Sequence, residues 1–107
     1  METFRFWRGL VGSPFFETEE ARMESRVALI AVMVEKKDNV GKLNEILHEY
    51  GEYIIGRMGL PYPKRGVQII SVAVDAPVNV INTLSGKIGR LEGITSKTVY
   101  SGVVSAE

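Results

Sequence analysis

Hydrophobic and polar positions along this chain change between two spacings, one typical of strands and one typical of helices. Apolar residues at nearly every position are typical of a strand that is covered on both faces. Apolar residues that alternate with polar ones are typical of a strand with one exposed face. Apolar residues three or four positions apart are typical of an amphipathic helix. The spacing predicts strands at Arg26–Val34, Glu52–Leu60, Val67–Asp75 and Ile94–Ser101, helices at Asp38–Tyr50 and Pro77–Leu91, and a Pro/Gly-rich loop at Leu60–Gly66.

The order of these elements, β-α-β-β-α-β, predicts an α+β domain with the ferredoxin-like fold, a four-stranded antiparallel sheet with two helices on one face. The strands at 26–34 and 67–75 are the most apolar, so we expect them at the centre of a sheet of strand order 4-1-3-2. The last strand is polar enough for an edge. We therefore interpret residues 26–101 as one domain, 1–25 as an N-terminal extension and 102–107 as a C-terminal tail.

One face of such a sheet carries no helix. Because the two central strands are apolar on both faces, a monomer would expose a large apolar patch, which soluble monomers rarely do. Either a second subunit or the N-terminal extension could cover this patch. We favour a subunit, and expect a homodimer or a homotetramer.

The turn after the first strand is a candidate ligand site. Asp38 is a good N-cap residue, and Gly41 removes a side chain from the first helical turn. Free backbone N–H groups at a helix start can bind a carboxylate or a phosphate. We therefore predict that Asp38, Asn39, Val40 and Gly41 form a notch for a small anionic effector. The alternative is an ordinary capped helix with a tolerated glycine.

The second helix contains an unusual pair of glycines, Gly86 and Gly89. Each costs about 1 kcal/mol relative to alanine in a helix interior. By helical angle they lie with Asn82 on the face opposite the apolar stripe. A face without large side chains suits the close approach of another backbone, so Asn82, Gly86 and Gly89 are predicted to form an interface. The alternative is a poorly optimised, exposed helix face.

Composition argues against several functions. The chain has no cysteine, which excludes disulfides and thiolate metal sites, and its one histidine, His48, is expected on the exposed flank of the first helix. We expect no cofactor and no metal. Neither a Ser-His-Asp set nor a P-loop is present, so we interpret the chain as non-enzymatic.

The charge balance and hydropathy bear on partners and location. Thirteen basic residues balance thirteen acidic ones, which argues against direct binding of nucleic acid. No apolar stretch reaches the roughly 18 residues that a membrane helix needs. We expect a cytoplasmic protein without a membrane partner.

The N-terminal extension differs in composition from the domain, since it contains Trp7 and all four phenylalanines, interrupted by Arg5, Arg8 and two glycines. Three interpretations stay open. It is a weakly ordered tail that rests its aromatic residues on the domain or on a neighbouring subunit. It is an extension upstream of a true start at Met23. Or it is an aromatic and basic arm that docks on nucleic acid or on a partner.

Two sets of residues resemble known families. The turn Asp38-Asn-Val-Gly-Lys-Leu43 resembles the D-x-P-G-x-L turn of ACT domains, with Val40 in place of the proline. ACT domains are βαββαβ modules that bind amino acids and other small effectors. Residues 26–101 resemble the iron-only hydrogenase system regulator family, which is short, ACT-like and similar to the C-terminal effector domain of nickel-responsive repressors. The segments that carry this second resemblance are Leu84-Ser-Gly-Lys-Ile-Gly89, Asn44–His48, Ile54–Gly59, Gly93-Ile94 and Lys97-Thr-Val99.

The second resemblance implies a regulatory role connected with iron-only hydrogenase genes, exerted through a bound effector or through a hydrogenase-related protein partner. Nickel sensing is not implied, because the histidine and cysteine ligands of the repressors are absent. The expected function is thus an oligomeric, small-molecule-responsive regulatory module. A structural protein-interaction module and direct DNA binding by the N-terminal arm are the alternatives.

Overall fold

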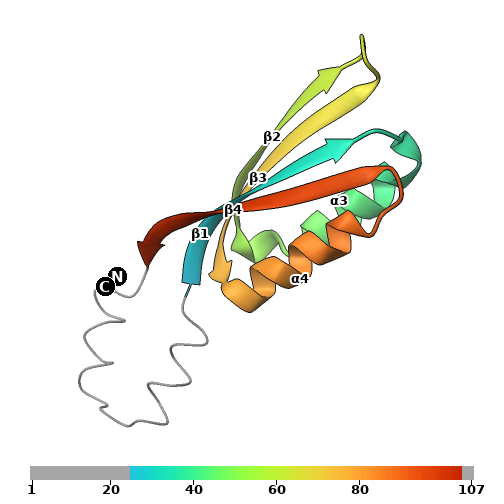
Figure 1. The fold of residues 1–107 in the computed structure, drawn as a ribbon. Helices are drawn as coiled ribbons and strands as arrows, with labels where there is room; N and C mark the ends of the chain where they lie inside the picture. Colours follow the sequence, from blue (N-terminus) through green and yellow to red (C-terminus); the bar gives the residue numbers. More distant parts are fainter. Residues whose placement is uncertain (1–24, 105–107) are drawn as a thin grey trace, which may run out of the picture.

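A computed structural model describes residues 25–104 of the chain, and of Val103 and Val104 only the backbone. The expectations for the N-terminal extension and the C-terminal tail therefore lie largely outside the described residues. Four strands, two α-helices and two short 3-10 turns follow in the predicted order (Figure 1). They are β1 (Ser25–Val34), η1 (Lys37–Asn39), α3 (Val40–Glu49), η2 (Gly51–Tyr53), β2 (Ile54–Tyr62), β3 (Val67–Pro77), α4 (Val78–Gly89) and β4 (Ile94–Val104).

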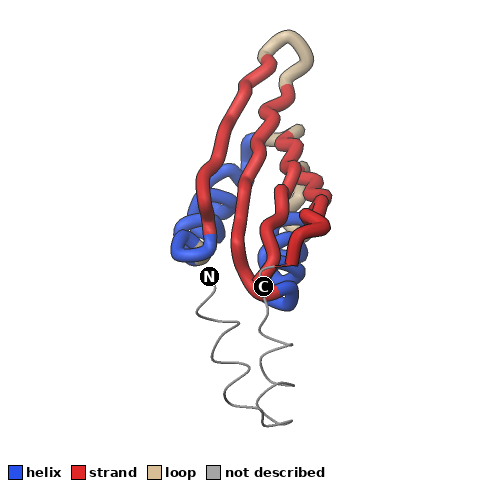
Figure 2. Tube along the Cα trace, turned by 90° about the vertical axis from the view of Figure 1, so that its left-hand side faces the viewer, coloured by secondary structure: helices blue, strands red, loops and turns tan. Residues whose placement is uncertain are grey.

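The strands form one antiparallel sheet of order β2-β3-β1-β4, which confirms the predicted ferredoxin-like topology. The two most apolar strands, β1 and β3, lie at its centre. The hairpin of β2 and β3 extends well beyond the two helices (Figure 2). The far end of this hairpin is therefore not covered by the helix layer.

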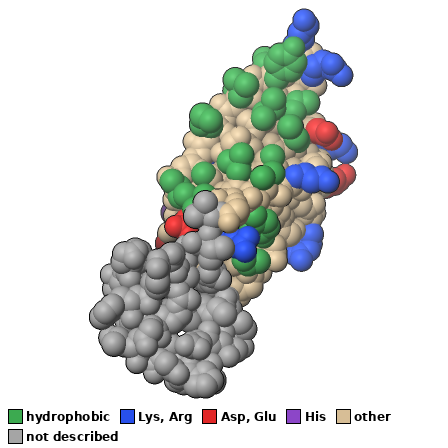
Figure 3. All heavy atoms as spheres, turned by 60° about the vertical axis from the view of Figure 1, so that its left-hand side comes forward, with side chains coloured by type: hydrophobic (Ala, Val, Ile, Leu, Met, Phe, Trp, Pro, Cys, Tyr) green, Lys and Arg blue, Asp and Glu red, His purple; other side chains and the backbone are tan. Residues whose placement is uncertain are grey.

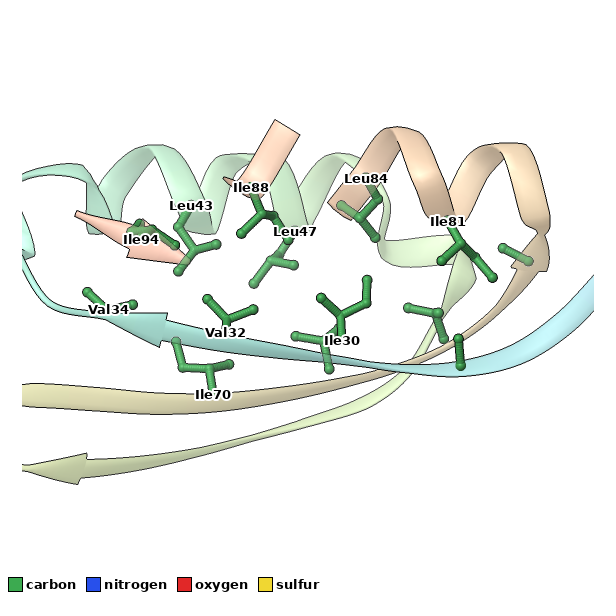
Figure 4. Packing of buried hydrophobic residues seen from close by; sticks show 14 residues of the cluster. Ile30, Val32, Val34, Leu43, Leu47, Ile70, Ile81, Leu84, Ile88 and Ile94 are labelled. Atoms are coloured by element: carbon green, nitrogen blue, oxygen red, sulfur yellow. The ribbon is translucent and has the colours of Figure 1, made fainter. Parts of the chain in front are cut away.

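The core lies between the helices and one face of the sheet (Figure 4). Alternate residues of the central strands point into it, because successive side chains of a strand lie on opposite faces. Ile30 of β1 and Val72 of β3 are paired in register, and both are fully buried. The other buried apolar residues are Ala28, Val32, Val34, Leu43, Leu47, Ile70, Val74, Ala76, Ile81, Leu84, Ile88 and Ile94.

Polar contacts join the helices to each other and to the edge of the sheet. Lys87 of α4 lies with its Nζ 5.1 Å from the ring centroid of Tyr50 and 3.7 Å from Glu49 Oε1. The hydrogen bond to Tyr50, and then the charge of Glu49, raise the pKa of Lys87. Arg57 Nη2 on β2 donates a hydrogen bond to Asn44 Oδ1 on α3 at 3.3 Å.

Two local predictions were wrong. The first helix begins at Val40 rather than at Asp38, and no side chain caps it or the 3-10 turn before it. The expected loop at Leu60–Gly66 is shorter, because β2 continues through Pro61 to Tyr62. A proline, which has no backbone N–H to donate, fits there because β2 is an edge strand of the sheet.

Candidate functional site

The corner after β1 is held in place by the connection between α4 and β4. The backbone N–H groups of Glu35 and Lys36 both donate to the carbonyl oxygen of Gly93, at 2.7 and 3.3 Å. Asn39 Nδ2 donates to the carbonyl oxygen of Glu92 at 3.0 Å. Gly93 has φ +82°, and a Cβ at this position would lie 2.5 Å from Lys36 Cβ. Two segments far apart in the sequence thus meet closely, and the corner is fixed on the domain.

A cavity of about 450 Å³ lies between this corner and the extended β2–β3 hairpin. Strand register places Val34, Gln68 and Pro61 side by side across β1, β3 and β2. Lys37 of the 3-10 turn contributes from the corner. The full lining consists of Val34, Lys37, Pro61, Tyr62, Pro63, Gly66, Val67 and Gln68.

The cavity is mostly apolar and contains two polar side chains that the fold does not use. Within residues 25–104, neither the Lys37 ammonium nor the Gln68 amide makes a hydrogen bond or an ion pair. An apolar cleft with a few unpaired polar groups is the usual form of a small-molecule site. One cation and one amide beside proline, tyrosine and valine walls suit a small carboxylate with an apolar body.

The predicted notch residues directly follow Lys37 but do not line this cavity. Asp38 and Gly41 are exposed, and a Cβ added to Gly41 would meet no atom within 4 Å. The Asn39 side chain donates a hydrogen bond to the backbone carbonyl of Glu92, and Val40 packs against the core. The structure thus places the four residues outside the cavity walls, and their ligand-binding role stays a prediction.

The predicted interface residues of α4 do not share a bare outer face. Asn82 Oδ1 accepts a hydrogen bond from the Tyr100 hydroxyl at 2.6 Å, and a Cβ on Gly89 would lie 3.1 Å from Ser96 Oγ. The expectation that Asn82 and Gly89 face away from the sheet was wrong, because the flank of α4 that carries them packs along β4. Gly86 would meet only Arg90 Nη2, at 3.8 Å. An interface role for these residues stays a prediction.

A contact that the sequence reasoning missed explains part of the same helix. Ser85 lies opposite β4: Ser96 Oγ donates to the Ser85 carbonyl oxygen at 2.9 Å, and Thr98 Oγ1 donates to Ser85 Oγ at 3.1 Å. Small residues at Ser85 and Gly89 let the helix approach this polar edge strand. The alternating hydroxyl residues of β4 were the signal that could have revealed the contact. Gln68 was also missed, because nothing in the sequence brings the hairpin to the corner.

The described residues offer few other groups that could bind a metal or take part in a reaction. His48 is exposed on α3, as predicted. No group of three or more His, Cys, Asp or Glu side chains within residues 25–104 could hold a metal ion. In the same part of the chain, no helix is both long and apolar enough to cross a membrane.

The sheet, its two helices and the corner cavity define a single ferredoxin-like α+β domain. The sequence model of the TM1266-like family, whose description reads "Iron-only hydrogenase system regulator, putative", matches residues 26–98. The chain belongs to this family. Among solved structures, it is similar to an uncharacterized protein, TM1266 from Thermotoga maritima, with 31% sequence identity and a TM-score of 0.69. That match covers 72% of this chain and 98% of the Thermotoga chain. No protein of curated function matches the chain. The likeness to ACT domains stays a prediction.

Proposed function

We propose that this protein is a cytoplasmic regulatory protein of the iron-only hydrogenase system that works as a homodimer or homotetramer and responds to a small effector without catalysing a reaction. The hydrogenase connection and the regulatory role are those of the family's name. The observation that supports an effector is the corner cavity of about 450 Å³, whose Lys37 has no ion-pair partner among residues 25–104.

The effector that suits this cavity is a small carboxylate with an apolar body. Its carboxylate would pair with Lys37, and the Gln68 amide would donate or accept one further hydrogen bond. Pro61, Tyr62 and Pro63 would bury the apolar part. The backbone at Asp38–Gly41, which directly follows Lys37, would add partial positive charge.

A ligand in this position would connect two parts of the molecule. Lys37 belongs to the corner that is bonded to Glu92 and Gly93, whereas Gln68 and Tyr62 belong to the extended hairpin. Bridging them would stabilise one position of the hairpin relative to the domain. A regulatory protein needs such a difference between its bound and free states.

Thermal-shift measurements on the full chain test this proposal. The probes are the common amino acids, 2-oxo acids and nucleotides, each supplied well above its expected Kd. A probe that raises Tm for the wild type should fail with Lys37→Gln, because the carboxylate loses its counter-charge. The matched control is Lys42→Gln, an exposed lysine of α3 outside the cavity, which should keep the shift.

A further variant separates the cavity from the notch at the helix start. Gly41→Val would fill the approach to the first turn of α3 but leaves the cavity walls unchanged. Loss of the shift in Gly41→Val with retention in Lys37→Gln would move the effector to the notch. If no probe shifts the wild-type Tm, the effector proposal is wrong.

A second candidate function is a protein-interaction module that binds a hydrogenase-related protein. It is favoured by the exposed apolar face of the sheet, which includes Leu29 and Met58. This module would bind its partner without any small molecule. The aromatic arm that could bind DNA lies outside the described residues, and a salt-dependent DNA retardation assay tests it.

A further inference from the structure

The sheet face opposite the helices is apolar across all four strands. On β1, Val27, Leu29 and Met33 are exposed by 43%, 44% and 39%, and on the edge strands Met58, Leu60 and Val99 are exposed by 73%, 63% and 65%. Strand pairing puts them on one surface: Leu29 is opposite both Ala73 and Val99, and Leu60 is opposite Ile69. Hydrophobic side chains gather along the sheet up to the hairpin (Figure 3).

This open face of the sheet is uneven as well as apolar. Two hollows, of about 300 and 260 Å³, lie on either side of Leu29. Small residues form their floors, namely Ala73 in both and Gly56 with Ser71 in the second. The face therefore carries both protruding side chains and the depressions that such side chains fill. A two-fold interface needs this property, because the same patch must fit itself.

The size of the face also fits a second copy. Each partner in a standard interface contributes about 800 Å², of which a little over half is apolar. The six residues above, exposed by 39–73%, supply much of such an apolar share. By strand register the charged residues of this face are Lys97 on the edge strand β4 and Asp75 near the end of β3. Arg57 also lines the second hollow, but its guanidinium donates to Asn44 on the helix side of the sheet.

We propose that two copies of this chain pack with their open sheet faces against each other, and that Leu29 and Met58 of each copy sit in the hollows of the other. This inference rests on the oligomeric part of the proposed function and names its surface. The competing occupant is the N-terminal extension, which contains Trp7 and four phenylalanines as well as Glu17, Glu19, Glu20 and Glu24. The mass measurement below distinguishes it from a second copy, because an extension that covers the face of its own chain leaves the protein monomeric.

The test measures the mass of the full chain by light scattering at several concentrations. Leu29→Glu should halve the mass, because a charge at the centre of the interface would be buried without a partner. Met58→Glu should raise the dissociation constant at least about tenfold, and it lies on an exposed edge strand where folding tolerates a charge. The matched control is Val78→Glu, an apolar residue 36% exposed at the start of α4, which should keep the wild-type mass. Circular dichroism checks that each variant is folded.

Each other outcome overturns the proposal in a recognisable way. A folded Leu29→Glu and Met58→Glu that both keep the wild-type mass would place the interface on another surface and leave the oligomeric function standing. A monomeric wild type would leave the face to the N-terminal extension or to a different protein. Effector binding is read separately, as the Lys37-dependent Tm shift, so a failure there does not alter the mass result.

Discussion

The two faces of the sheet are built from alternate residues of the same strands, yet within residues 25–104 the helices cover only one of them. Ile30 is fully buried under the helices, whereas its neighbour Leu29 is 44% exposed on the open face. The residue types barely differ, so hydrophobicity alone does not decide which side of a strand is buried within one chain. The difference shows that the helices bury one of two similarly apolar sheet faces and leave the other exposed.

The largest expected effect separates these two faces directly. Ile30→Ala should lower the free energy of unfolding by about 2–5 kcal/mol, because it leaves a cavity in a closely packed core. At low protein concentration, Leu29→Ala should lower the free energy of unfolding by roughly 1 kcal/mol or less, since the Leu29 side chain is already partly exposed to solvent. Urea unfolding measures both. Equal losses at low concentration would contradict the contrast between the faces.

Protein concentration sharpens the same pair. If the open face is an interface, the Tm of the wild type rises with concentration, because association stabilises the folded state. Leu29→Ala should weaken this dependence, and Ile30→Ala should lower Tm at every concentration alike. A concentration-independent wild-type Tm would count against the face-to-face dimer.

The next effect compares two glycines with positive φ, one against a covered corner and one in the open. Gly66 (φ +68°) in the hairpin turn has open space around a Cβ, so Gly66→Ala should cost about 1–2 kcal/mol from its left-handed backbone alone. Gly93→Ala adds a clash with Lys36 Cβ, for roughly 1–2 kcal/mol more. Urea midpoints give the difference. Equal costs would show that the corner yields to the added methyl group.

A third pair concerns the polar part of the covered face. Ser85→Ala should cost about 1 kcal/mol, because Thr98 Oγ1 loses its half-buried acceptor. The exposed Thr83 hydroxyl of the same helix donates to the backbone carbonyl of Asn79, four residues earlier in α4. Because this bond joins no other element, Thr83→Ala should change the free energy of unfolding by less than about 0.5 kcal/mol. Thermal unfolding compares them. A larger loss for Thr83 would mean that the α4–β4 contact matters less than its hydrogen bonds indicate.

The fold could be predicted from the sequence because each element has one clear period, and two central strands are apolar throughout. That same uniformity hid which parity of β1 faces the helices: Ile30 and Leu29 are equally apolar, and only the packing of α3 and α4 distinguishes them. The corner cavity could not be predicted, because Lys37 and Gln68 meet only through strand register and the length of the hairpin.

The prediction of an N-cap at Asp38 was wrong for a similar reason. A cap is a local signal, and Asp38 fits it, but the neighbouring Asn39 is drawn into a bond with the α4–β4 connection, and the first turn becomes 3-10. The expected outward orientation of Asn82 and Gly89 on α4 was wrong because helical angles alone do not say which flank of a helix an edge strand occupies. Contacts between segments far apart in the sequence determine both the start of the first helix and the flank of α4 that packs on β4. Such contacts cannot be predicted from a single sequence.

The smallest effect distinguishes the two neighbours at this corner. From sequence, Asp38→Ala would cost about 1 kcal/mol through a lost cap. The structure shows no capping bond and an exposed carboxylate, so we expect a change within about 0.5 kcal/mol. Asn39→Ala should cost more, about 0.5–1.5 kcal/mol, because it removes the bond to the Glu92 carbonyl that holds the corner. Urea unfolding at low protein concentration measures both without interference from association. An Asp38→Ala variant that loses as much as Asn39→Ala would restore the cap and place the start of the first helix at Asp38 after all.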